Sequence, residues 1–251
     1  MSFILIYGKP GTGKTTLAST MVNLGYKVLF LDLDQKVKKM VNLASLLDSG
    51  DIQVKTIEAK LTEVNLKQRI MTPKVAIVKQ PKGYLEFCDI ITDLENMADN
   101  GEKHECNVLV VDSLTALLEH LDRLISHLQK KSHWTFDEWA ILLTNLEEFF
   151  YTMMKLQEVF KHVIIIAHDQ TDKDEDTGRV LDVLPQIKGS MRYKAAKYFE
   201  EVYVTTVDVK RTGEAKFQVL TKPVDKCHAR TSRTIPTVEV ADFGVLFKEE
   251  L

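Results

Sequence analysis

The chain carries Gly8-Lys9-Pro10-Gly11-Thr12-Gly13-Lys14-Thr15, which follows the pattern G-x-x-x-x-G-K-T. A loop of this kind cradles phosphate, because its glycines let successive backbone N–H groups point inward at the anion. Lys14 adds a point charge for the β- and γ-phosphates, and the Thr15 hydroxyl is a ligand for Mg²⁺. The residues that we expect to contact a nucleotide are Gly8, Lys9, Pro10, Gly11, Thr12, Gly13, Lys14, Thr15 and Thr16.

The flanks of this loop have the pattern that such a motif requires. Residues 3–7 form a short apolar run that is typical of a buried strand. Residues 16–24 predict a helix, with Leu17, Met21 and Leu24 on one face and Gly25 placed to end it. The helix directs its positive end at the same anion. The alternative, a chance glycine-rich turn, does not explain a strand on one side and a helix on the other.

Length and composition favour one α/β domain over residues 1–251, since 45% of the 251 residues are hydrophobic. The formal net charge is −3, so any nucleic-acid contact must come from a local basic patch. Cys88, Cys106 and Cys227 are widely spaced and are typical of reduced thiols. Met1–Phe3 leads directly into the first expected strand, which leaves no room for a signal peptide, and no apolar stretch approaches the roughly 20 residues of a membrane span. We therefore expect a cytoplasmic location and no membrane partner.

Apolar runs and helical patterns alternate along the chain. The predicted strands are 3–7, 27–33, 74–79, 107–112 and 162–167. This alternation predicts a mostly parallel central sheet with helices on both faces. Two hydrophobic stripes at helical spacing are interpreted as core faces: Leu114, Leu117, Leu118, Leu121, Ile125 and Leu128, and then Trp139, Leu142, Leu146, Phe149, Met153 and Leu156.

Two other regions predict antiparallel strands. Residues 52–57 and 74–79 alternate, and we expect them to form a small antiparallel addition within 36–105, the least typical segment of the chain. Residues 202–210 and 216–222 flank a turn-like 211–215, which predicts a hairpin that extends one edge of the sheet. Beyond residue 223 the pattern is irregular, with one strand expected near 237–240.

Three polar residues follow predicted strands and are candidates for the chemistry of the site. Asp112 ends the apolar strand 107–112, where a carboxylate can hold Mg²⁺ opposite Thr15. Asp34 is a candidate to activate water, and its alternative is a cap for the next helix. His168 follows strand 162–167 and is a candidate contact for the γ-phosphate, with an ordinary histidine at a strand end as its alternative.

Taken together, these segments resemble the RecA-like recombinase core, and more narrowly the small phage-type RecA-like ATPases of single-strand annealing. The resemblance rests on GKPGTGKTT (8–16), LDLD (31–34), NVLVVDSLTALL (107–118), and VIIIAHDQTD (163–172) followed by LPQIKGSMRYKAAKYFEEVYVTT (184–206). It implies a RecA-like P-loop domain that binds ATP and Mg²⁺, self-associates with ATP at subunit interfaces, and binds single-stranded DNA. A single-strand DNA-binding protein is a further expected partner, and the location would be the host cytoplasm if the chain is phage-encoded.

The resemblance also assigns roles to particular positions. Asp34 stands at the position of the water-activating carboxylate, which is usually Glu, and His168 stands near the γ-phosphate sensor. Segment 170–188 corresponds to a mobile DNA-binding loop. Lys222 lies where relatives supply a cation to the neighbouring subunit's ATP, with Arg230 and Arg233 as rivals. The chain begins near its first strand, without the N-terminal extension of the larger recombinases, and this favours annealing or ring-like assembly over a long filament.

Residues 186–199 form the basic segment expected to contact DNA. It holds Lys188, Arg192, Tyr193, Lys194 and Lys197 and no acidic residue, and basic side chains interleaved with aromatics suit a single strand with stacked bases. The acids in 169–176 would repel phosphate and are expected in a solvated loop. The alternative is an ordinary helix with a solvated basic face.

The sequence therefore predicts an ATP-hydrolysing, single-stranded-DNA-binding protein of phage-type recombination. Two alternatives stay open. One is a RecA-like helicase or loader motor, and the other is an ATPase switch that acts on partner proteins without nucleic acid.

Overall fold

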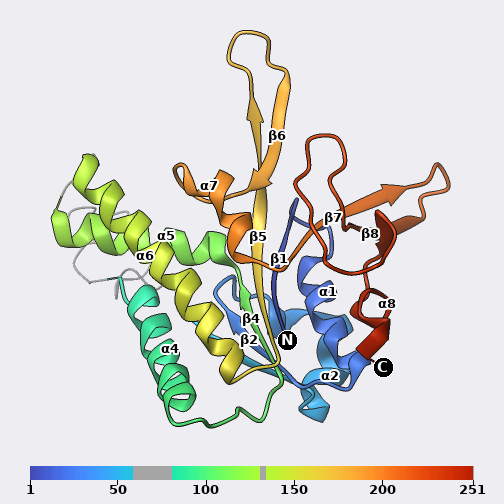
Figure 1. Ribbon diagram of the computed structural model, residues 1–251, viewed down its shortest axis with the longest axis horizontal. Helices are drawn as coiled ribbons and strands as arrows, with labels where there is room; N and C mark the ends of the chain where they lie inside the picture. Colours follow the sequence, from blue (N-terminus) through green and yellow to red (C-terminus); the bar gives the residue numbers. More distant parts are fainter. Residues whose placement is uncertain (59–80, 131–133, 251) are drawn as a thin grey trace, which may run out of the picture.

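The computed structural model describes residues 1–58, 81–130 and 134–250, and within them an α/β fold with helices on both faces of a central sheet (Figure 1). The strands are β1 (Ser2–Gly8), β2 (Val28–Asp32), β3 (Ile52–Thr56), β4 (Val108–Asp112), β5 (His162–Lys173), β6 (Val180–Pro185), β7 (Glu201–Val209), β8 (Ala215–Leu220) and β9 (Val238–Val240). They join in the order β3-β2-β4-β5-β1-β7-β8-β9, with β6 paired to β5. From β3 to β7 neighbouring strands are parallel, and β8 and β9 continue the sheet antiparallel. The predicted fold class is confirmed.

Successive residues of the buried strands supply the two faces of the core. Ile4 and Ile6 of β1 point to the side covered by α1 (Lys14–Ser19), the following 3-10 turn η1 (Thr20–Leu24), α2 (Ala44–Ser49) and α8 (Phe243–Leu246). Phe3, Leu5 and Tyr7 point to the side covered by α4 (Gly83–Asp99), α5 (Leu114–Gln129) and α6 (Phe136–Lys155). This is the period-2 alternation of a strand that is buried on both faces.

The helices follow the predicted stripes closely. Leu17, Met21 and Leu24 are buried, and Gly25 ends the segment in the left-handed region at φ 77°. Most of both long stripes is buried, but Leu128 and Trp139 at their outer ends are exposed. Of the helices in the described ranges, none combines the length and the apolarity needed to cross a membrane.

One prediction about strands is wrong. Residues 52–56 form β3, which pairs in parallel with β2 at the sheet edge and is no antiparallel addition. It does so because its residues run alongside β2 from Val28↔Ile52 to Asp32↔Thr56, as a β–helix–β crossover through α2 permits. The other half of that prediction, 74–79, lies outside the described residues. The hairpin expected at 202–222 and the strand near 237–240 are confirmed as β7–β8 and β9.

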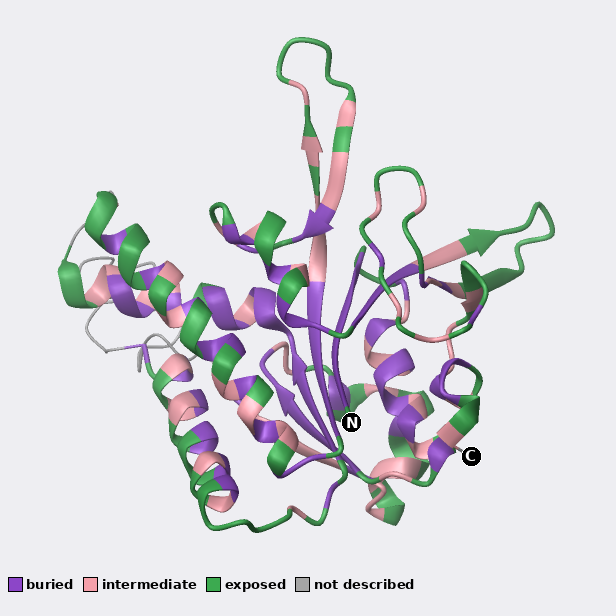
Figure 2. Ribbon diagram, viewed as in Figure 1, coloured by how far each residue is buried: buried purple, intermediate pink, exposed green. Residues whose placement is uncertain are grey.

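The segment 170–188, expected as a mobile loop, has more regular structure than a loop, and its mobility stays a prediction. Most of it is a β-hairpin, because β5 continues past the sheet to Lys173 and β6 pairs with it antiparallel. Asp174 closes the turn by accepting hydrogen bonds from the backbone N–H and the hydroxyl of Thr177, at 2.8 and 2.7 Å. The hairpin projects from the buried sheet and is exposed at its tip (Figures 1 and 2). Short α7 (Met191–Lys194) lies at its base.

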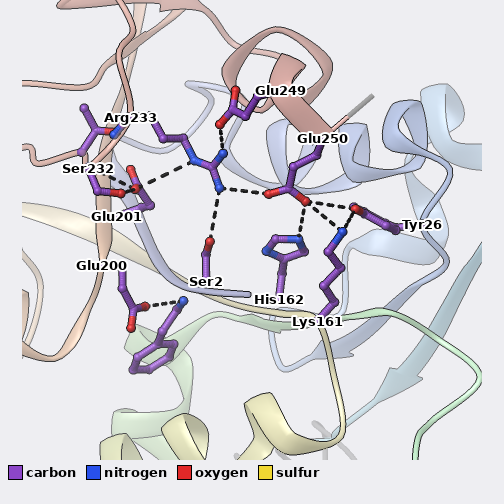
Figure 3. A network of polar contacts seen from close by, with 12 residues as sticks. Ser2, Tyr26, Lys161, His162, Glu200, Glu201, Ser232, Arg233, Glu249 and Glu250 are labelled. Atoms are coloured by element: carbon purple, nitrogen blue, oxygen red, sulfur yellow. Dashed lines mark hydrogen bonds and ion pairs between the residues drawn. The ribbon is translucent and has the colours of Figure 1, made fainter.

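A polar network fastens the C-terminal residues to the amino end of the central strands (Figure 3). Arg233 contacts Glu250 at 3.0 Å, pairs with Glu249, and donates to the Ser2 hydroxyl at 3.3 Å. Glu250 also accepts from the His162 ring at 3.2 Å and lies 3.1 Å from the Lys161 ammonium. These contacts join β1, β5 and the last 3-10 turn, η6 (Lys248–Glu250), at the end of the sheet opposite the phosphate-loop motif.

Candidate functional site

The phosphate-loop motif connects the buried end of β1 at Gly8 to the start of α1 at Lys14. Gly8 has φ 155°, and a Cβ there would lie 2.5 Å from the Thr205 hydroxyl, so only glycine fits. The Lys14 ammonium is buried and donates to the carbonyl oxygens of Gly8 and Lys9, both at 2.8 Å. Burial lowers the pKa of Lys14 from its ordinary value, and the nearby Asp112 opposes that shift. A bound anion would therefore gain a cation that is already desolvated and positioned.

Asp112 and Thr15 meet at the centre of the site. The Thr15 hydroxyl donates to Asp112 Oδ2 at 2.6 Å, although the two residues lie far apart in the sequence. Burial at the end of β4 raises the pKa of Asp112 to about 6, with Asp34 and Asp32 adding to the shift and Thr15 and Lys14 opposing it. A hydroxyl and a buried carboxylate in contact are hard oxygen ligands that fit Mg²⁺, and the cation would offset the cost of the buried charge. Among the described residues, no separate cluster of three or more metal-ligating side chains occurs.

Asp34 and His168 face each other across the mouth of the same site. Asp34 Oδ2 lies 3.9 Å from His168 Nε2 and 3.8 Å from the Lys36 ammonium. The pKa of His168 is lowered, first by partial burial and then by the Lys14 charge, so the ring is neutral at pH 7. Together with the motif these side chains line a cavity of about 290 Å³, whose walls are Pro10, Gly11, Gly13, Lys14, Thr15, Thr16, Asp34, Lys36, Met40, Asp112, His168 and Phe217.

The alternative for Asp34 was that its side chain caps the next helical turn. In the structure a different residue, Asp32, makes those contacts. Asp32 is buried and accepts from the backbone N–H groups of Lys36 and Val37, at 3.2 and 3.0 Å. Asp32 therefore caps the 3-10 turn η2 (Val37–Lys39), and the Asp34 carboxylate is left facing the cavity.

The three cations expected to act on a neighbouring subunit lie apart from this cavity. Lys222 is exposed just beyond the end of β8. Arg230 is exposed, and its guanidinium donates to the Ala196 carbonyl at 3.2 Å. Arg233, the third candidate, belongs to the network at the opposite end of the sheet, where its guanidinium forms a structural ion pair with Glu250. Neither Lys222 nor Arg230 is among the described residues that line the cavity.

The basic segment expected to bind DNA is partly neutralised by acids from other elements. Lys188 pairs with Asp122 of α5. Arg192 lies 3.7 Å from Asp172 of the hairpin, and the Tyr193 hydroxyl donates to the same carboxylate. Lys194 and Lys197 are exposed, and the Lys197 ammonium lies 4.6 Å from the centre of the Tyr198 ring. Three-dimensional pairing of this kind is invisible in 186–199 itself, where no acid occurs.

Several residues around the site escaped the sequence analysis. Asp32 was overlooked beside Asp34, although both lie in the quoted LDLD segment. Thr205 of β7 shares a 2.6 Å hydrogen bond with the Thr12 hydroxyl, and no local pattern signals that contact. Met40 and Phe217 line the cavity from segments far apart in the sequence. Phe217 could have been found only through the alternation of the predicted strand 216–222.

The sequence matches a family model described as an AAA domain (AAA_24) over residues 2–234. A search of curated proteins finds no match to the sequence. Among solved structures, uncharacterized protein PH0321 from Pyrococcus horikoshii, in complex with an unknown peptide, aligns at TM-score 0.42 and 11% identity, over 87% of this chain and 82% of its own. ATP synthase subunit NeqB from Nanoarcheaum equitans aligns at 0.40 and 13%, over 82% and 45%. The Legionella pneumophila ATPase DotB aligns at 0.31 and 10%, over 87% and 45%.

Proposed function

The chain belongs to the AAA domain family of P-loop nucleotidases, and on that premise we propose that it hydrolyses ATP to ADP and phosphate with Mg²⁺. The observation that carries the proposal is the 2.6 Å contact between Thr15 and Asp112, next to the buried Lys14 ammonium. It brings a cation for the phosphates and two oxygen ligands for a metal into one cavity. Mg²⁺ bound there would neutralise charge on the β- and γ-phosphates.

The remaining side chains have roles that follow from their positions in the cavity. Lys14 and the backbone N–H groups of the motif bind and orient the triphosphate. Asp34, at the mouth of the cavity, orients the attacking water and accepts its proton. His168 is neutral, so its ring can donate a hydrogen bond to a γ-phosphate oxygen without adding a second positive charge beside Lys14.

A finer proposal concerns what hydrolysis drives. We propose that the β5–β6 hairpin and α7 bind single-stranded DNA, in the manner of phage-type annealing ATPases. The supporting observation is continuity: β5 runs without a break from His168 at the cavity into the hairpin, so contact at His168 can change the hairpin's position. ATP at an interface between copies, completed by Lys222 or Arg230, belongs to the same proposal.

The ATPase proposal is tested by measuring phosphate release from ATP, with Mg²⁺ and with EDTA. We expect Lys14→Ala to lower the rate by at least about 10²–10³-fold, the usual size for losing one preorganised group that stabilises a transition state. Asp112→Asn should lose the response to Mg²⁺. Lys38→Ala, an exposed lysine outside the cavity, is the matched control. Hydrolysis at the parent rate by the Lys14→Ala protein would refute the assignment.

Single-stranded DNA separates the finer alternatives in the same assay. Stimulated phosphate release and nucleotide-dependent binding of a labelled single strand would support the DNA proposal. A motor would also unwind or translocate on DNA. ATP hydrolysis with no response to DNA under any nucleotide condition would instead favour the switch that acts on partner proteins.

A further inference from the structure

Phe217 is an aromatic side chain placed against the phosphate-loop motif by a distant strand. It lies on β8 and lines the candidate cavity, yet 45% of its surface is exposed. A Cβ added at Gly13 would lie 3.1 Å from its ring, so the ring packs directly on the backbone of the motif. Gly13 has φ 86°, which favours glycine, and the absent side chain leaves the space that the ring occupies.

The direction of the side chain follows from its strand. Val219, two residues further along β8, is buried in the cluster that contains Leu17 and Ala18 of α1. Because residues i and i+2 of a strand share a face, Phe217 points to the same side of the sheet as α1. Its ring therefore stands beside the start of α1, where the N–H groups of the motif would hold phosphate.

The cavity is divided into a charged side and an uncharged side. Asp34 follows β2, Asp112 ends β4 and His168 lies within β5, and these three strands lie on one flank of β1. Phe217 comes from β8, on the other flank of β1. A triphosphate whose γ end and metal lie with the carboxylates must extend its nucleoside end away from them, and Phe217 offers an apolar surface on that opposite flank.

We propose that Phe217 is the stacking platform for the nucleobase of the bound nucleoside triphosphate. This deepens the proposed ATPase function and rests on it. The ring already packs on Gly13, so it is held in place before ligand arrives, and its exposed part is what a base would cover. Since every base has a π-face, Phe217 contributes affinity without choosing among bases. Other exposed apolar residues of this edge, such as Val238 and Val240, do not line the cavity among the described residues.

The test compares ligands with and without a base. Binding of ATP, GTP and inorganic tripolyphosphate, each with Mg²⁺, is measured by calorimetry on the full chain and on Phe217→Ala. We expect Phe217→Ala to weaken ATP and GTP alike by roughly 5- to 150-fold, the range for losing one base–aromatic stack, and to leave tripolyphosphate unchanged. Phe217→Tyr should restore nucleotide affinity. The control is Phe136→Ala, since that phenylalanine of α6 is 86% exposed and lies outside the cavity.

A second variant reports position directly. In Phe217→Trp, the indole emission should be quenched by ATP and left unchanged by tripolyphosphate, against the constant background of Trp134 and Trp139. Equal loss of ATP and tripolyphosphate affinity in Phe217→Ala would show that the ring only shapes the motif, and unchanged ATP affinity would show that no base rests on it. Either result overturns the base platform while leaving the ATPase proposal for the wild-type chain intact. A wild-type chain that binds neither ligand would overturn the ATPase proposal and the platform together.

Discussion

The two ends of the central strands treat charge in opposite ways. At the amino end, the Arg233 guanidinium is largely buried among carboxylates and lies 3.3 Å above the centre of the Phe247 ring. At the carboxyl end, the carboxylates gather with few counter-charges, and the nearest contact of Asp34 to a cation or histidine is 3.8 Å. At the amino end, carboxylates form close ion pairs with cations, whereas at the carboxyl end the Asp34 carboxylate has only longer contacts.

The pKa shifts express this difference. At the amino end, contacts with Lys161, His162, Tyr26 and Arg233 hold the pKa of Glu250 at about 2 against the opposing effect of burial. At the carboxyl end, burial and neighbouring acids raise the pKa of Asp112 to about 6. A charged group kept at an unfavourable pKa in a cavity is typical of functional sites, because a ligand can supply the missing partner. The amino end stabilises the fold, and the carboxyl end is the site proposed to bind a cation and phosphate.

The largest expected effect comes from substituting Asp34 at the carboxyl end. Asp34→Asn should leave ATP bound but slow its turnover by a factor on the order of 10²–10⁴, the usual size for losing a general base. Stability in the absence of ligand should hold or rise, since one of the like charges near Asp112 disappears. Single-turnover hydrolysis and urea unfolding on the same protein check both parts. Unchanged turnover in Asp34→Asn, with Asp112→Asn inactive, would remove Asp34 from the chemistry.

A substitution at the amino end should instead lower the stability of the fold. Arg233→Ala leaves the buried Glu201, which is 1% exposed, without its nearby cation at 3.9 Å. It also removes the Arg233 ion pairs of Glu249 and Glu250, although Glu250 keeps its contacts with Lys161 and His162. Removing one partner of a buried pair typically costs about 3–5 kcal/mol in the free energy of unfolding. Arg230→Ala is the matched control, because its guanidinium is exposed and, among the described residues, makes a single bond, to the Ala196 carbonyl. We therefore expect a loss below about 1 kcal/mol. Similar midpoints of urea unfolding for the two variants would contradict the structural role of Arg233.

The sequence predicts the carboxyl end of the central strands better than the amino end, for a physical reason. Lys14, Thr15 and Asp112 were identified because local patterns, a glycine-rich turn and an apolar strand ending in a carboxylate, decide their positions. Arg233 was grouped with cations for a neighbouring site because its partners come from residues 2, 201, 249 and 250, and nothing near Arg233 in the sequence announces them. The parallel direction of β3 was also hidden, since alternation in 52–57 fixes a strand and not its orientation.

The hairpin 169–185 illustrates the same limit. The acids in 169–176 suggested a solvated loop, but pairing between distant positions, such as Gln170↔Leu184 and Thr171↔Val183, turns most of the hairpin into strands. Likewise, the basic composition of 186–199 predicted free cations, and Asp122 and Asp172 neutralise two of them from other elements.

The pH dependence of the free energy of unfolding should also distinguish the two ends, and we expect this effect to be of intermediate size. Burial lowers the pKa of His162 to about 4, so the unfolded chain binds its proton first as the pH falls. The stability due to neutral His162 is complete above about pH 6.5 and is lost as the pH falls toward 4, by at most about 3 kcal/mol. Glu250 adds a loss of the same sign below about pH 4.5. Asp112 acts with the opposite sign, because its raised pKa makes the folded chain bind the proton first between about pH 6 and 4.

The measurement is the urea midpoint between pH 7 and 4 in the absence of ligand. His162→Gln removes the titrating ring and should flatten the decline, whereas Asp112→Asn removes the opposing group and should steepen it. A His162→Gln protein whose stability falls as steeply as the parent's would show that the ring is not held neutral by burial.

The smallest expected effect concerns the β5–β6 hairpin beyond the carboxyl end of the sheet, where some charged side chains are already paired. Asp172 holds Arg192 at 3.7 Å and accepts from Tyr193, which masks two residues proposed to contact DNA. Asp172→Asn should free Arg192 and raise single-stranded DNA affinity by up to about fivefold, the worth of a partly exposed ion pair. The salt dependence should steepen by about 0.7 in log–log slope, because one more phosphate is contacted. Asp176→Asn removes the same charge from the exposed hairpin turn without touching Arg192, so it measures general repulsion. Equal gains in the two variants would mean that Asp172 repels DNA only through its charge and masks nothing.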